Sequence, residues 1–164
     1  MIRTLRLAVV LGLMAVVLVG AGTVAAKPGG PGGPGGPGHG PKKILDTRLV
    51  GLAVPGTVVV GVTGAGHAWA LKEGKATLSS DGRVDLHVHG LVLTPEGTNP
   101  VANGRVVVSC NGGGAGNVVQ SGLVPLSVPK GDAHFNGWLT LPSPCLAPVI
   151  FFTSPGGAWF AVSG

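Results

Sequence analysis

The sequence predicts an all-β protein, a single antiparallel β-sandwich of immunoglobulin-like or related Greek-key topology. From Ile44 onward the chain holds 20 glycines and 9 prolines, so hardly any stretch long enough for a helix lacks a helix breaker. Valine-rich runs of four to eight residues recur between turn signals, a spacing typical of sandwiches. Residues 44–164 are enough for one domain with its own core, and we expect the sandwich to occupy them.

The first element in chain order is a predicted signal peptide over residues 1–26. Arg3 and Arg6 precede an apolar run, and the small residues Val24, Ala25 and Ala26 follow it. An uncleaved membrane anchor is the alternative, but the run is shorter than the ~20 residues that a spanning helix prefers. We therefore expect cleavage after Ala26, a secreted extracellular protein and no membrane attachment of the mature chain.

Residues 27–43 are predicted to be a disordered Gly/Pro-rich linker. Proline recurs at every third position from Pro28 to Pro37 with glycines between, which is the pattern of a collagen repeat. The triplets are too few to hold three chains together against the entropy of ordering them. Glycine pairs favour flexibility and proline disfavours helix, so the sequence indicates a solvated connection.

Ten strands are expected in the body of the chain, each bounded by turn signals. They are Leu45–Val54, Thr57–Thr63, His67–Lys72, Lys75–Ser79, Arg83–Leu93, Arg105–Cys110, Val118–Val128, Ala133–Leu141, Pro148–Thr153 and Ala158–Val162. One hairpin is specific enough to predict its register. A three-residue loop with Gly82 in the left-handed conformation keeps both faces consistent. It pairs Leu78 with Val84, Ala76 with Leu86, Thr77 with Asp85 and Lys75 with His87.

Cys110 and Cys145 are the only two cysteines of the chain. In an exported protein such a pair is most simply a disulfide, and closing a loop of this length stabilises the fold by roughly 3–4 kcal/mol. A redox-active pair is usually Cys-x-x-Cys, and a zinc site needs two further ligands. We therefore predict a structural disulfide.

A candidate metal site lies on the predicted strand that begins at Arg83. Asp85, His87 and His89 share one face because strand side chains alternate, and two imidazoles two residues apart can contact one ion. Glu73 is an alternative oxygen ligand, and His67 or His134 is a candidate third nitrogen. The same spacing is also typical of the solvent face of a half-buried strand, and this interpretation stays open.

Charge and motifs argue against several function classes. From Ile44 onward six basic residues are balanced by six acidic ones, so no basic groove for nucleic acid is expected. The glycine-rich stretch 111–117 lacks the ending of a phosphate-binding loop, and no Gly-x-Ser-x-Gly motif occurs. We expect neither an enzyme nor a bound cofactor.

Aromatic residues are few, and most are expected in the core. Alternation along the strand after Asp132 places Phe135 and Leu139 inward and Trp138 outward. Trp138 is therefore the candidate exposed aromatic for binding a ligand.

The stretch Trp69–Arg83 and the later Leu141–Pro148 resemble a group of small secreted bacterial proteins with no assigned function. A local similarity over Gly74–Leu91 is to the chordin-type β-domain. Neither resemblance implies an activity or a site residue.

Three functions follow as hypotheses. The first is an exported, non-enzymatic binding or structural module with an extracellular or cell-surface partner. The second is a secreted metal-binding protein that uses the His-x-His face. The third is a hydrolase with an unrecognised site. Exposure of Trp138 beside a groove favours the first, and convergence of His67 or His134 on the histidine pair favours the second.

Overall fold

The computed structural model describes residues 40–164, and this part of the chain contains strands and no helix. The predicted signal peptide and most of the predicted linker lie outside the described residues. No helix in residues 40–164 is long and apolar enough to cross a membrane. The strands are β1 (Lys43–Gly51), β2 (Val58–Val59), β3 (Val62–Thr63), β4 (Trp69–Ser79), β5 (Arg83–Leu93), β6 (Asn103–Ser109), β7 (Val118–Gln120), β8 (Val124–Pro125), β9 (Ala133–Trp138), β10 (Val149–Thr153) and β11 (Trp159–Ser163).

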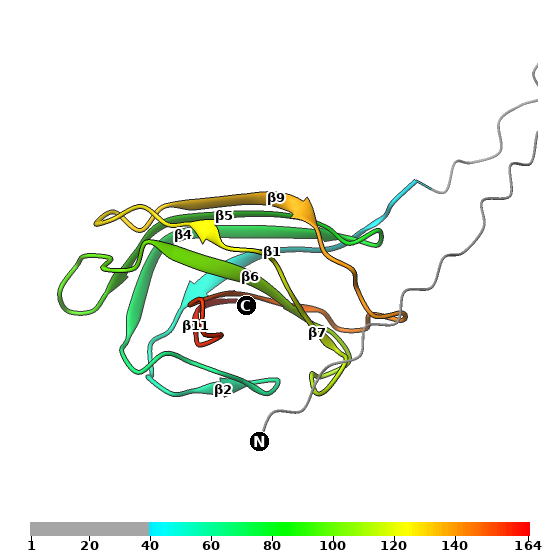
Figure 1. Ribbon diagram of the computed structural model, residues 1–164, viewed down its shortest axis with the longest axis horizontal. Coiled ribbons are helices and arrows are strands. Elements are labelled where there is room, and N and C mark those ends of the chain that lie inside the picture. Colours follow the sequence, from blue (N-terminus) through cyan, green and yellow to red (C-terminus); the bar gives the residue numbers. More distant parts are fainter. Residues whose placement is uncertain (1–39) are drawn as a thin grey trace, which may run out of the picture. The chain divides into compact units, whose positions relative to one another are not determined.

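Nine strands form one antiparallel sheet in the order β7-β6-β10-β11-β1-β4-β5-β9, with β8 pairing β6, and β2 and β3 form a separate ribbon. Strand β1 joins the two halves of the sheet. Its first part, Lys43–Arg48, pairs with β4, and its last part, Leu49–Gly51, pairs with β11. The sheet curls, so that β4, β5 and β9 lie on one side of the core and β11 on the other (Figure 1). The predicted all-β antiparallel class is confirmed.

The β4–β5 hairpin has the predicted register, including the pairs Ala76 with Leu86 and Thr77 with Asp85. Gly82 adopts the expected left-handed conformation, with φ of 84°. The predicted break between Lys72 and Lys75 is wrong, because β4 runs through it. A Cβ on Gly74 would lie 2.7 Å from the Cβ of Leu49, so this glycine permits a close approach of β1 and does not form a turn.

Two other predicted strands are each divided in the structure. Thr57–Thr63 becomes the β2–β3 ribbon, because Val60 and Gly61 take positive φ values of 38° and 81° and form its turn. Val118–Val128 becomes β7 and β8, which are separated by Ser121–Leu123. At this break the side chain of Ser121 adds to the pairing with β6, because the amide of Val106 donates to Oγ of Ser121 at 2.9 Å.

The core is most complete in the half of the sheet that contains β10 and β11. Residues Ile150–Thr153 and Trp159–Val162 are all buried, so both faces of these strands are covered. The β2–β3 ribbon contributes to this cover, because the indole of Trp159 donates to the carbonyls of Thr57 and Val62, both at 3.1 Å. Strands β4, β5 and β9 instead alternate between buried and exposed residues, so one of their faces is open to solvent.

The predicted disulfide between Cys110 and Cys145 is confirmed, with the two Cα atoms 5.0 Å apart. Asn111 reinforces this connection. Its side-chain amide donates to the carbonyl of Pro144 at 2.9 Å, and its side-chain oxygen accepts from the amide of Leu146 at 2.9 Å. The segment that follows β9 is thereby held against the end of β6.

Candidate metal centre

The outward side chains of β4, β5 and β9 form a continuous polar surface, here called the polar face. The inward positions of these strands are apolar and fully buried, as at Ala76 and Leu86. Two-residue periodicity sends the alternate positions to solvent. The polar face comprises Lys75, Thr77, Arg83, Asp85, His87, His89, His134, Asn136 and Trp138.

Strand pairing arranges the polar face in rows across the sheet. His87 lies directly opposite His134 of β9, and Asp85 lies opposite Asn136. Directly opposed side chains in an antiparallel sheet are close enough to contact. The rings of His87 and His134 stack, with centroids 4.2 Å apart and an interplanar angle of 22°.

Three metal-ligating atoms converge at this point. Nε2 of His87 lies 2.8 Å and Nε2 of His134 lies 3.9 Å from Oδ1 of Asp85. One ligand atom from each of the three residues lies within 4.8 Å of the other two. Within residues 40–164, this is the one group of three or more His, Cys, Asp or Glu side chains that meets this criterion. Ligands about 2.0–2.1 Å from a tetrahedral zinc ion are about 3.3 Å apart. The distances from Oδ1 of Asp85 to the two histidine nitrogens, 2.8 and 3.9 Å, lie on either side of this ligand–ligand distance.

The three side chains have room to adjust to an ion. His87 and His134 are 62% and 55% exposed, and Asp85 is 35% exposed. Rotation of an exposed side chain by about 30° costs about 0.5–1.5 kcal/mol, so the three ligands can move relative to one another at small cost.

Asn136 orients the carboxylate of Asp85. Its side-chain amide donates to Oδ2, and this leaves Oδ1 directed at the two histidines. The oxygen of Asn136 in turn accepts from Nη2 of Arg83 at 3.4 Å. A hydrogen bond of this kind fixes the direction of a metal-ligating carboxylate.

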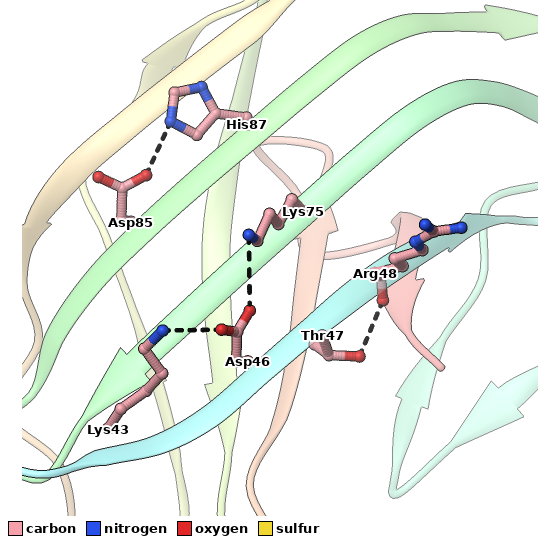
Figure 2. A network of polar contacts seen from close by, with 7 residues as sticks. All are labelled: Lys43, Asp46, Thr47, Arg48, Lys75, Asp85 and His87. Atoms are coloured by element: carbon pink, nitrogen blue, oxygen red, sulfur yellow. Dashed lines mark hydrogen bonds and ion pairs between the residues drawn. The ribbon is translucent and has the colours of Figure 1, made fainter.

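The ammonium of Lys75 is directed toward Asp46, although Lys75 is the register partner of His87 (Figure 2). Its Nζ lies 3.9 Å from Oδ1 of Asp46, whose other oxygen binds Nζ of Lys43 at 2.7 Å. The hydrogen bond from Lys43, with the charges of both lysines, lowers the pKa of Asp46 despite some desolvation. Asp46 therefore partly compensates the positive charge of Lys75, which borders the same depression as His87.

His89, the second histidine of the predicted pair, lies elsewhere on the polar face. Its Nδ1 lies 2.6 Å from Oδ1 of Asp132, which also accepts from the amide of Gly90 at 3.0 Å. The Gly90 hydrogen bond is the largest cause of a lowered pKa of Asp132; desolvation opposes it, and the hydrogen bond with His89 and the charges of His89 and Lys130 add to the lowering. The structure groups Asp85 with His87 and His134, and His89 is outside this group.

The remaining candidate ligands also lie outside the group. His67 is exposed in the bend before β4, and Glu73 is the register partner of His89. The sequence predicts His134 only as one of two candidates for a third nitrogen. Its place opposite His87 depends on the pairing of β5 with β9, which no local pattern specifies.

Trp138 is exposed as predicted, at 64%. The guanidinium carbon of Arg83 lies over its ring, 5.4 Å from the centroid. Leu139 is buried, and Phe135 is half-buried against the core, as expected from the alternation. The polar face therefore includes an exposed aromatic side chain at the end of β9.

No family model matches the chain, and no curated protein or solved structure matches it either. The function is therefore inferred from the polar face itself.

Proposed function

We propose that the protein is an exported, non-enzymatic module that binds a divalent transition metal ion, Zn²⁺ or Cu²⁺, through Asp85, His87 and His134. The observation that carries this proposal is the convergence of two imidazole nitrogens on one carboxylate oxygen. Imidazole and carboxylate form a common ligand set for these ions. Three protein ligands leave at least one coordination position open to solvent.

The open position favours exchangeable binding over a structural role. The strands below the site are already packed, since Ala76, Leu78, Val84 and Leu86 are 0% exposed. The fold does not depend on an ion to organise its core, in contrast to small zinc domains. The ion is therefore a ligand at the surface, accessible to a further molecule.

The fold and the expected location are consistent with this role. We propose that the curled sheet forms a sandwich of two layers, β4-β5-β9 and β6-β10-β11. Strand β1 passes from the first layer to the second, as strands do at the corners of orthogonal packings. The disulfide supports the proposal of export, because such bonds persist in oxidising compartments.

Isothermal titration of the full chain with ZnCl₂ and CuCl₂ tests the proposal. We expect one ion per chain and at least a tenfold loss of affinity in His87→Ala, in His134→Ala and in Asp85→Asn. His89→Ala is the matched control, because it removes an exposed histidine from the same strand face but not from the group.

Two results would contradict the proposed site. Absence of saturable binding in the wild-type chain would exclude it. Loss of affinity in His89→Ala with none in His134→Ala would assign the ion to the His-x-His pair along β5. Both outcomes are read from the same titrations.

A further inference from the structure

A hollow lies at the end of β9, apart from the group of Asp85, His87 and His134. It has a volume of about 480 Å³, within the range of about 300–1,000 Å³ typical of small-molecule sites. Three segments meet around it: the start of β1, the β4–β5 turn and the chain that follows β9. The lining residues are Ile44, Ser80, Asp81, Trp138, Leu139, Thr140, Leu141, Pro142, Ser143 and Cys145.

The walls of this hollow are held by hydrogen bonds and by the disulfide. Ser80 and Lys42 bind each other twice, at 2.7 and 3.0 Å, which joins the β4–β5 turn to the start of β1. The amide of Leu139 donates to the carbonyl of Gly82 at 2.9 Å. Cys145 is bonded to Cys110 at the far end. A site with fixed walls loses little entropy when a ligand binds.

Trp138 lines this hollow, and the guanidinium carbon of Arg83 lies 5.4 Å from the centroid of its ring. Arg83 lies over the ring but does not line the hollow; it lines a separate depression with Asp85 and His87. Arg83 therefore restrains the indole, and Trp138 remains 64% exposed and accessible to a ligand. Asp81, Ser80, Thr140 and Ser143 provide a carboxylate and hydroxyl groups around it.

We infer that this hollow binds a neutral saccharide, with the C–H face of a pyranose ring packed on Trp138 and its hydroxyl groups donating to Asp81. An aromatic plane beside carboxylate and hydroxyl acceptors matches the two surfaces of a sugar, one apolar and one rich in donors. The saccharide site and the metal site are independent proposals, since they share no lining residue.

Charge and aromatic content favour a saccharide over other ligands. No lysine, arginine or histidine lines the hollow, whereas phosphate and sulfate ligands are bound most strongly by cationic side chains. Proline-rich peptides dock in grooves lined by several aromatic side chains, and this hollow has one. A sugar ring needs only a single aromatic plane.

Titration calorimetry of the full chain with cellohexaose, chitohexaose and mannohexaose, each up to about 10 mM, tests the inference. We expect at least one of these saccharides to bind, with a tenfold or greater loss in Trp138→Ala, partial retention in Trp138→Phe and a weaker loss in Asp81→Asn. Trp138 is exposed, so these variants should keep the thermal stability of the wild type. His87→Ala should bind the saccharide normally.

Leu146→Ala is the matched control, since Leu146 is 63% exposed on the same segment and does not line the hollow. It should leave saccharide affinity unchanged. Three results overturn the inference: no saccharide binds, binding is equal in Trp138→Ala and the wild type, or a synthetic proline-rich peptide binds through Trp138 while the saccharides do not.

Discussion

The imidazole rings of His87 and His134 stack 4.2 Å apart, although the two residues come from different strands. They are direct register partners in the β5–β9 pairing, and both Nε2 atoms face Oδ1 of Asp85. The candidate metal site is thus built across the sheet and not along one strand. Histidines two residues apart on β5, by contrast, have separate carboxylate partners, Asp85 and Asp132.

Metal affinity should fall as the pH is lowered. An imidazole must be neutral to bind a metal, so acid weakens metal binding by histidine ligands. We expect at least a tenfold decrease in zinc affinity between pH of about 7.5 and about 5.5, measured by calorimetry. Affinity that is constant over this range would show that oxygen ligands alone hold the ion.

Asp132 should make stability dependent on pH at the acidic end. Its pKa is lowered in the folded state, chiefly by the amide of Gly90. The carboxylate therefore stabilises the fold fully above its unfolded pKa of about 3.9, and this contribution is lost as the pH falls through the lower folded value.

Comparison of the wild type with Asp132→Asn by urea unfolding checks this expectation. The wild type should be the more stable above pH of about 5, and the difference should shrink below pH of about 4. A difference that grows on acidification would mean that the sign of the pKa shift is wrong.

Removal of the disulfide should destabilise the chain substantially. The bond between Cys110 and Cys145 closes a loop with a sequence separation of 35. Cys110→Ser with Cys145→Ser should lower the free energy of unfolding by about 3–4 kcal/mol, as measured in urea. The same variant should lose more affinity for the saccharide than for the metal ion, because Cys145 lines the hollow and the group of Asp85, His87 and His134 lies away from it.

Gly82→Ala should cost more than an equivalent substitution in open space. Gly82 has φ of 84°, and a Cβ there would collide with the carbonyl oxygen of Leu139. Gly56 also has positive φ, 71°, but nothing lies within 4 Å of its Cβ position. We expect about 1–2 kcal/mol of destabilisation for Gly56→Ala, from the left-handed conformation alone, and a larger loss for Gly82→Ala. Equal losses in thermal unfolding would show that the turn moves freely.

Trp159→Phe should loosen the β2–β3 ribbon. The substitution keeps an aromatic ring but removes the N–H that donates to Thr57 and Val62. The carbonyl of Val62 then loses this donor, whereas that of Thr57 keeps the amide of Gly64 at 2.8 Å, so we expect a cost of about 1 kcal/mol. Hydrogen exchange of the ribbon amides should accelerate more than exchange in β5. Unchanged exchange in the ribbon would show that apolar packing alone holds it.

Local patterns predicted the β4–β5 hairpin well and the division of other strands poorly. The hairpin register depends on residues within a few positions of Gly82, and those residues are themselves consistent on both faces. The sequence around Gly74 predicted a break between two strands. The role of this glycine could not be predicted locally, because it depends on Leu49 of β1, which lies opposite it in space. Ser121 likewise interrupts a valine-rich run, because its side chain pairs with Val106 of β6.

Alternation along a strand and the count of cysteines are local properties, so the all-β class, the disulfide and the outward direction of Asp85, His87 and Trp138 could be predicted without the fold. The approach of His134 to Asp85 and His87 depends on the fold, as does the position of Trp138 at a hollow that the segment ending at Cys145 also lines. These groupings require strands distant in the chain to pair in one register. The free energy that selects this register comes from burying the whole core, so no single segment of the sequence contains it.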